Sequence, residues 1–161
     1  MLKHLTALAA VLTMAVPATA KVDTGTVRLL QTMEEYGVTV LYNPTDCNQG
    51  FAGRYSTEKE LIVCYQGSPT AHDFDTIRHE ATHFIQHCAA LRRGRNAIQP
   101  IAANPALRSQ WVSSVLNTSA INQIKETYPK HHHQVELEAF ASAAHYSAKD
   151  LTGLIKQWCR K

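Results

Sequence analysis

Several features are scarce in this chain of 161 residues, and each shortage excludes a class of protein. The charges nearly balance, with 16 Lys and Arg against 13 Asp and Glu, so we expect neither nucleic acid nor an anionic membrane as a partner. No C-x-x-C pair occurs, which argues against a redox site or an all-cysteine zinc site. The apolar run from Leu5 to Val16 is too short to span a bilayer comfortably. The chain also lacks internal repeats and a linker long enough to divide it into domains.

The first twenty residues have the layout of a secretory signal peptide. Lys3 and His4 precede the apolar run, and residues 18–20, Ala-Thr-Ala, form an Ala-x-Ala cleavage site. The mature chain should begin near Lys21 and keep 141 of the 161 residues, enough for one domain that folds without a structural metal. We therefore expect a single exported domain, secreted or periplasmic.

All four cysteines lie in the part of the chain that would be exported. An even number of cysteines in an oxidising compartment predicts two disulfides, for which three pairings are possible. Cys47 and Cys64 flank a predicted pair of strands, while Cys88 and Cys159 each end a predicted helical segment. We favour these two pairs.

The hydrophobic periodicity predicts an α+β fold. Apolar residues recur every three to four positions from Asp23 to Tyr36, which indicates a helix that ends at Gly37. Strands are expected in three segments, of which the last two form a hairpin or lie side by side: residues 37–44, 51–56 and 61–66. The rest of the chain is expected to be helical, in five segments: residues 73–91, 104–117, 119–128, 133–148 and 148–161. A small sheet should thus precede a mostly helical lobe.

One motif carries specific chemistry. Residues 79–83, His-Glu-Ala-Thr-His, fit H-E-x-x-H, which places two histidines one turn apart on one side of a helix, where both can bind one metal ion. Glu80 between them could then act as the general base of a zinc peptidase. The alternative is a helix that carries histidines by chance, because the chain contains nine of them.

The position of the motif on its helix separates these two interpretations further. At 100° per residue, His79 and His83 lie about 200° and 240° from the apolar stripe that runs from Ile77 to Cys88, so they are not ordinary core histidines. They are either solvated or, if a second lobe lies across that face, part of a cleft. Glu80 lies beside the stripe, where partial burial would raise its pKa towards the range useful for a general base.

His87 is not expected to be the third ligand. Three side chains spread over two helical turns cover about 12 Å of rise, too far for one tetrahedral ion. Metzincins avoid this limit by breaking the helix at a glycine, but Gln86 occupies that position here. A third ligand should therefore come from elsewhere, and the predicted helix 133–148 offers Glu136 and Glu138. These two glutamates lie about 200° apart, so only one can face the metal.

Residues 137–142, Leu-Glu-Ala-Phe-Ala-Ser, resemble the Asn-Glu-Gly-Phe-Ala segment of one aminopeptidase family and the Asn-Glu-Ala segment of thermolysin-like enzymes. With H-E-x-x-H upstream, the chain resembles gluzincin-type zinc metallopeptidases of the zincin fold. The resemblance implies that Glu138 binds zinc together with His79 and His83. Glu136 is the alternative, because it fits the E-x-x-A form of other gluzincins. The 54 residues between His83 and Glu138 exceed the gap in the two families named.

Peptide hydrolysis also needs a hydrogen-bond donor where negative charge develops. His145, seven residues after Glu138 and on the same helix face, is one candidate. Three tyrosines are further candidates: Tyr55, Tyr128 and Tyr146. The histidine run 131–133 is expected to be a solvated loop or a helix start, because consecutive side chains diverge.

In zincin peptidases an edge strand beside the zinc helix often holds the substrate in extended form. The candidate residues for this role are Gly53, Arg54, Tyr55 and Ser56, although an ordinary hairpin strand fits them equally well.

These features together predict an exported peptidase that holds one Zn²⁺ and acts on a peptide or protein substrate. Two alternatives belong to other classes. One is a non-catalytic zincin relative that retains the metal as an exported binding module. The other is a disulfide-stabilised helical interaction protein without a metal.

Overall fold

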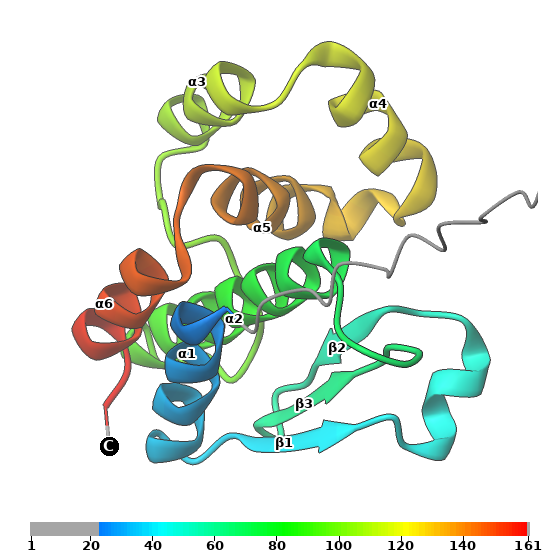
Figure 1. Ribbon diagram of the computed structural model, residues 1–161. Helices are drawn as coiled ribbons and strands as arrows, with labels where there is room; N and C mark the ends of the chain where they lie inside the picture. Colours follow the sequence, from blue (N-terminus) through cyan, green and yellow to red (C-terminus); the bar gives the residue numbers. More distant parts are fainter. Residues whose placement is uncertain (1–22, 161) are drawn as a thin grey trace, which may run out of the picture.

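The structure, a computed structural model, describes residues 23–160. The predicted signal peptide lies outside the described residues. The described chain has the expected α+β architecture, with six α-helices and a three-stranded mixed sheet (Figure 1). The elements in chain order are α1 Thr24–Glu35, β1 Thr39–Tyr42, η1 Thr45–Gln49, β2 Gly53–Tyr55, β3 Glu60–Val63, α2 Ala71–Arg92, α3 Pro105–Val115, α4 Thr118–Thr127, η2 Lys130–His132, α5 His133–His145 and α6 Ala148–Trp158.

The sheet has the strand order β1-β3-β2. β2 and β3 pair antiparallel, which confirms the predicted hairpin, whereas β1 pairs parallel with β3. β2 is therefore an edge strand, and it packs against α2 (Figure 1). The predicted packing of a small sheet on the H-E-x-x-H helix is confirmed.

Helix α2 is the longest element and carries the H-E-x-x-H motif. It begins two residues before the predicted start because Thr70 and Asp73 form a capping box, in which each side chain accepts a hydrogen bond from the other residue's backbone amide. The predicted apolar stripe from Ile77 to Cys88 is buried, but Leu91, expected at its end, is exposed. Residues 79–90 are buried on every side of the helix, which shows that other elements cover its polar face as well.

The core has two hydrophobic clusters. One joins α1, the sheet, α2 and α6, and the other joins α3, α4 and α5. α5 lies along α2, and α3 and α4 pack against α5 rather than against α2 (Figure 1). The polar face of α2 is therefore covered by a single helix, α5, which brings the side chains of residues 133–145 next to the motif.

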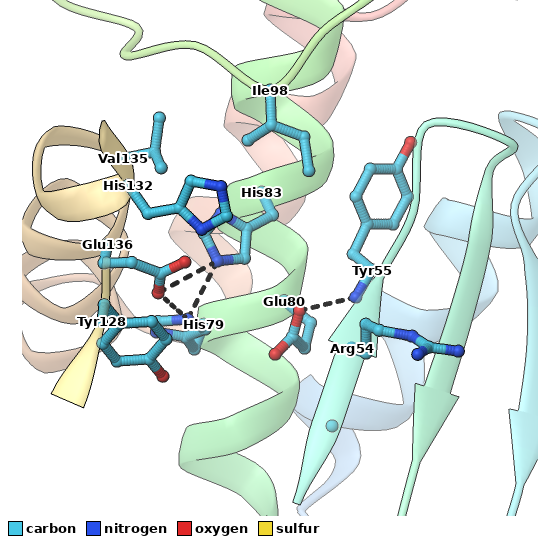
Figure 2. A pocket seen from close by; sticks show the side chains of 11 residues that line it. Arg54, Tyr55, His79, Glu80, His83, Ile98, Tyr128, His132, Val135 and Glu136 are labelled. Atoms are coloured by element: carbon cyan, nitrogen blue, oxygen red, sulfur yellow. Dashed lines mark hydrogen bonds and ion pairs between the residues drawn. The ribbon is translucent and has the colours of Figure 1, made fainter. Parts of the chain in front are cut away.

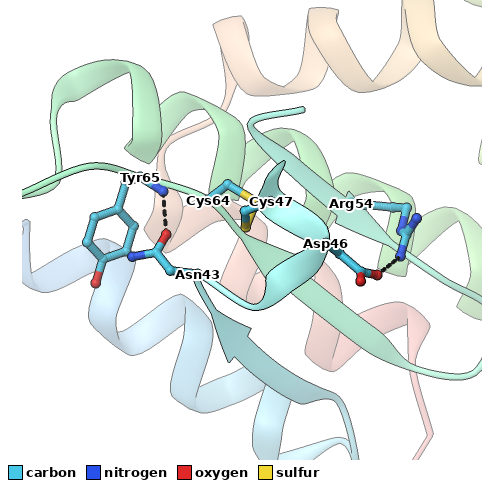
Figure 3. Close-up of a disulfide and its surroundings, with 6 residues drawn as sticks. All are labelled: Asn43, Asp46, Cys47, Arg54, Cys64 and Tyr65. Atoms are coloured by element: carbon cyan, nitrogen blue, oxygen red, sulfur yellow. Dashed lines mark hydrogen bonds and ion pairs between the residues drawn. A yellow bond between two sulfur atoms is a disulfide. The ribbon is translucent and has the colours of Figure 1, made fainter. Parts of the chain in front are cut away.

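Both favoured disulfides are confirmed. Cys47 and Cys64 link η1 to the end of β3 (Figure 3), and Cys88 links α2 to Cys159 after α6. Two disulfides indicate an oxidising environment outside the reducing cytosol. Within residues 23–160, no helix combines the length and the apolar character that a membrane crossing requires.

We expect the Cys88–Cys159 bond to stabilise the protein more than the Cys47–Cys64 bond. The first joins residues 71 positions apart and the second joins residues 17 apart, so loop-closure entropy predicts losses of about 4 and about 3 kcal/mol on removal. Urea unfolding of the double variants C88A/C159A and C47A/C64A, followed by circular dichroism, measures both. A larger loss for C47A/C64A would show that loop entropy does not set the order.

Candidate metal centre

The two motif histidines point their Nε2 atoms at one place. Because they stand one helical turn apart, the Nε2 atoms of His79 and His83 lie 3.0 Å from each other (Figure 2). Both side chains are buried, 7% and 6% exposed, because α5 covers this face of α2. Of the two outcomes that the helical wheel allowed, the structure shows a covered site and not a solvated surface.

Glu136 on α5 completes a cluster of three potential ligands. Its Oε2 lies 3.2 Å from the Nε2 of His79 and 3.5 Å from the Nε2 of His83. A tetrahedral ion with bonds of about 2.0–2.1 Å separates its ligand atoms by about 3.3 Å, so the three distances fit a site for one metal ion. Among the described residues, this is the one group of His, Cys, Asp and Glu side chains close enough to share an ion.

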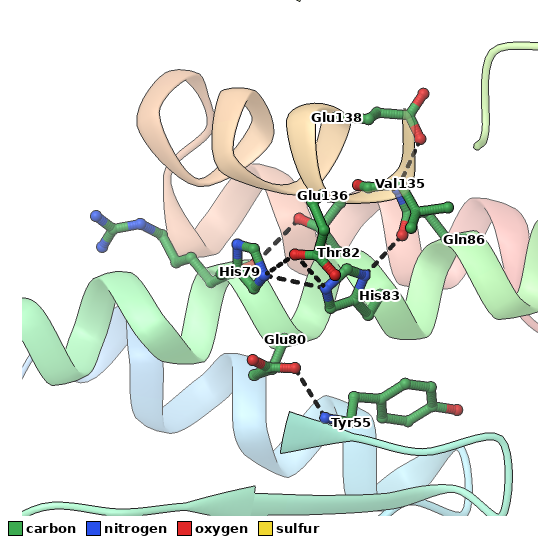
Figure 4. A network of polar contacts seen from close by, with 10 residues as sticks. Tyr55, His79, Glu80, Thr82, His83, Gln86, Val135, Glu136 and Glu138 are labelled. Carbon is green, nitrogen blue, oxygen red and sulfur yellow. Dashed lines mark hydrogen bonds and ion pairs between the residues drawn. The ribbon is translucent and has the colours of Figure 1, made fainter. Parts of the chain in front are cut away.

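The structure brings Glu136, the alternative ligand, and not the favoured Glu138 next to the two histidines. The carboxylate of Glu138 accepts hydrogen bonds from the backbone amides of Ile101 and Ala102 at 2.7 and 3.1 Å, and from Gln86 at 2.9 Å (Figure 4). It therefore faces the loop after α2. Both glutamates are buried, since α5 packs on two sides, and the rotation of α5 about its own axis turns Glu136 towards the histidines.

Gln86 fixes the orientation of His83, a role that the sequence analysis did not assign. Its Oε1 lies 2.8 Å from the Nδ1 of His83, while its Nε2 donates to Glu138 and to the backbone oxygen of Val135 (Figure 4). An amide oxygen only accepts, so the Nδ1 of His83 carries a proton, and Nε2, which faces Glu136, is the atom that would bind a metal. The available signal was a polar residue three positions after His83, on the same covered face.

The cluster attracts a cation. Burial disfavours the charged form of Glu136, but its close contacts with His79 and His83 outweigh burial and lower its pKa to about 2. Burial likewise opposes a charge on His83, yet Glu136 and the field of Glu80 raise its pKa to about 9. Two buried atoms, His79 Nδ1 and Glu136 Oε2, have no hydrogen-bond partner within residues 23–160. The anionic carboxylate and the two aligned imidazoles thus fit a bound metal ion.

Glu80 lies on the opposite side of the histidine pair from Glu136, next to β2 (Figures 2 and 4). On either side of β2, the Ala52 oxygen accepts from the Cys64 amide and the Ser56 amide donates to the Glu60 oxygen. Because hydrogen-bonded positions alternate along an antiparallel pair, the backbone groups of Gly53 and Tyr55 point away from β3. The amide of Tyr55 donates to the Oε2 of Glu80 at 2.8 Å. This backbone bond holds the Glu80 carboxylate in place.

A cavity of about 400 Å³ opens over these groups, a size typical of small-molecule and peptide sites. Its walls are formed by Gly53, Arg54, Tyr55, His79, Glu80, His83, Ile98, Tyr128, His132, Val135 and Glu136. Three of the four expected strand residues are therefore at the cavity, whereas Ser56 bonds to Glu60 in the hairpin. His145 does not line this cavity; it is exposed and packs against Trp111 and Tyr146.

The histidine run is only partly as expected. His131 and His132 are exposed in η2 and His133 begins α5, in agreement with a solvated helix start. The imidazole of His132 nevertheless lies at the cavity beside His83 (Figure 2). His133 donates to the backbone oxygen of Tyr128 at 2.8 Å and so ties α4 to α5.

Gly53 sets how closely β2 approaches α2. A Cβ atom at this position would lie 2.6 Å from the Thr76 Cγ2 and 3.2 Å from the Glu80 Cγ. We expect Gly53→Ala to push the strand away from the helix and to lower the free energy of unfolding by about 1–3 kcal/mol. Zinc affinity should change little, because no metal ligand lies on the strand.

The matched control for this substitution is Gly153→Ala in α6, where an added Cβ meets no atom within 4 Å. Alanine there should be neutral or slightly stabilising, because it favours the helix. Urea unfolding and zinc titration of both variants measure the difference. Equal stability of the two variants would show that β2 shifts without cost.

The chain matches no protein-family model, no curated protein and no solved structure.

Proposed function

We propose that the protein is an exported zinc peptidase with a zincin-like arrangement of its site. The observation that carries the proposal is the triangle of 3.0, 3.2 and 3.5 Å between the Nε2 atoms of His79 and His83 and the Oε2 of Glu136. Two histidines and one glutamate are the ligand set of thermolysin-type catalytic zinc, which keeps a fourth position open. The cavity next to this triangle gives a substrate access to that position.

A bound zinc ion would polarise the carbonyl of the scissile peptide and lower the pKa of water at the open position. Glu80 would accept the proton of that water and pass it to the leaving amine, which needs no covalent intermediate. The Tyr55 amide keeps one Glu80 oxygen engaged, so the other oxygen is free for this transfer. An acid-base residue beside the ligands favours hydrolysis over a purely structural metal site, which has no use for one.

Tyr128 and His132 replace His145 as the proposed donors to the developing oxyanion, because both line the cavity. Burial, together with the charges of Glu136 and Glu80, raises the pKa of Tyr128 to about 12. Its hydroxyl therefore keeps its proton at neutral pH and remains a hydrogen-bond donor.

The edge of β2 is the proposed binding place for an extended peptide. Its outward-pointing backbone groups belong to Gly53 and Tyr55, and both residues line the cavity. Since Glu80 occupies the Tyr55 amide, a substrate strand would pair with Gly53 and with the Tyr55 carbonyl.

Metal analysis of the mature protein, followed by a cleavage assay on an unstructured protein such as casein, tests the proposal. We expect one zinc per chain and cleavage that a chelator abolishes and zinc restores. Stoichiometric zinc without cleavage of casein or of a diverse peptide library would instead support a non-catalytic binding module. Failure to bind zinc after reconstitution would support a helical interaction protein.

A further inference from the structure

The loop of residues 93–104, which joins α2 to α3, contacts the residues that support the site at two places. Near its start, the side chain of Asn96 lies 2.7 Å from His87. Near its end, the amides of Ile101 and Ala102 donate to Glu138. These two contacts begin two separate chains of hydrogen bonds that run into the site.

The first chain runs from Asn96 through His87 and Tyr55 to Glu80. The Oδ1 of Asn96 only accepts, so the Nε2 of His87 carries a proton and its Nδ1 accepts from the Tyr55 hydroxyl, 2.8 Å away. Tyr55 in turn donates its backbone amide to Glu80 at 2.8 Å. The base is therefore held by a main-chain group, and the position of that group depends on how the Tyr55 side chain is anchored.

The side chains that form the first series of hydrogen bonds have little freedom to move. Tyr55 is 4% exposed and His87 is 1% exposed, and the Tyr55 ring packs against both Phe84 and His87. His87 is thus not a surplus metal ligand. It bridges β2 and the loop, on the side of α2 that faces the strand.

The second chain runs from the other end of the loop through Glu138 and Gln86 to His83. Ile101 and Ala102 hold the Glu138 carboxylate, Glu138 holds the Gln86 amide at 2.9 Å, and Gln86 holds the Nδ1 of His83 at 2.8 Å. This chain sets the direction of one metal ligand.

The loop is braced so that its two ends keep a fixed relation. Arg93 donates from Nη2 to the Pro100 oxygen at 2.9 Å and from Nη1 to the Ile101 oxygen at 3.4 Å. Arg108 in α3 donates to the Ala102 oxygen. Arg93 is therefore the side chain that links the start of the loop to its end.

We propose that the loop 93–104 is a common positioning element of the site, which aligns the base Glu80 through one end and the metal ligand His83 through the other. The kinetic part of this inference rests on the proposed peptidase function, whereas the part on metal affinity and amide exchange does not. A single change that loosens the loop should therefore disturb both the base Glu80 and the metal ligand His83.

Arg93→Ala tests this directly. We expect roughly tenfold weaker zinc affinity and roughly tenfold lower kcat, because outer-shell partners of a metal site have effects of about this size. The amides of Tyr55, Ile101 and Ala102 should also lose protection from hydrogen exchange. The control is Arg95→Ala in the same exposed loop. Within residues 23–160, the Arg95 guanidinium donates to the Gln99 side chain alone, so its loss should leave all three readouts unchanged.

Substitutions in the first chain separate positioning from general stability. Asn96→Leu should lower kcat and expose the Tyr55 amide to exchange while zinc affinity stays as in the natural protein. Asn96→Asp keeps an oxygen acceptor for His87, so kcat and the protection of the Tyr55 amide should both stay as in the natural protein. Tyr55→Phe, which keeps the ring and removes the hydroxyl, should act like Asn96→Leu; the control Tyr42→Phe changes an exposed tyrosine of the same sheet.

A substitution in the second chain should have the opposite effect: it should change zinc affinity and leave the exchange of the Tyr55 amide unchanged. Gln86→Leu should weaken zinc binding about 10- to 100-fold, because His83 loses the acceptor that fixes its tautomer. The Tyr55 amide should keep its protection.

The inference is overturned if Arg93→Ala leaves zinc affinity and amide exchange unchanged, or if Asn96→Leu and Gln86→Leu both alter the same single readout. If the protein binds zinc but cleaves no peptide, the proposed function fails. Zinc titration and hydrogen exchange still decide this inference in that case.

Discussion

Glu80→Gln should leave zinc bound and lower peptide turnover by roughly 100- to 10,000-fold, the usual contribution of a general base. The substituted amide keeps the shape of the side chain, and its oxygen can still accept the bond from the Tyr55 amide. It has no basic oxygen that could take a proton from water. Zinc titration and the rate of peptide cleavage under saturating zinc separate binding from turnover.

The control for this result is Glu58→Gln, which removes a carboxylate from the turn between β2 and β3 without touching the cavity. This variant should cleave peptides at the rate of the natural protein. If Glu80→Gln kept full activity while zinc remained bound, another group would have to act as the base.

Glu136→Gln should weaken zinc binding more than about 100-fold, beyond the usual effect of a residue outside the first ligand shell. Zinc would lose its only anionic protein ligand among His79, His83 and Glu136, and a neutral amide oxygen is a much poorer donor. Competition with a chelator of known zinc affinity measures the change, and peptide cleavage should fall with it.

Glu138→Gln is the decisive comparison, because both glutamates lie on α5, both are buried, and they are two residues apart. Glu138 acts on His83 only through Gln86, so its substitution should cost no more than about 10- to 100-fold. His131→Ala, an exposed histidine outside the cavity, should leave zinc affinity unchanged. A larger effect of Glu138→Gln than of Glu136→Gln would restore the ligand assignment suggested by family resemblance.

Much of the fold follows from local patterns. The spacing of apolar residues predicted the helices. The structure shows that side-chain caps at Asp23, Asn104 and Ser147 fix where three of them begin, and such a cap involves only side chains within three residues of it. The disulfide pairs also followed from the predicted elements. The exposed Leu91 was not foreseen, because periodicity does not show where a neighbouring element ends.

Local sequence patterns could predict only part of the candidate site. His79 and His83 are four residues apart on one helix, so helix geometry alone brings them together. Of the two proposed donors, Tyr128 was among the three tyrosine candidates, whereas His132 was expected to be solvated. Nothing in the local sequence of either residue shows that it lines the cavity. His145 lies outside this cavity for the same reason, because a spacing of seven residues along a helix fixes a face but not what lies opposite it.

The sequence by itself determined the histidine pair, the glutamate between them and the helices, all of which depend on short-range geometry. The order of the predicted elements also favoured the cysteine pairs that the structure shows. Only the tertiary structure decided which carboxylate of α5 meets the histidines and what the remaining one does. The periodicity shows that the two glutamates lie on different faces, but the rotation of α5 against α2 is set by packing along the whole interface. That packing turns Glu136 towards the candidate metal centre and Glu138 towards the loop 93–104, whose Ile101 amide it binds.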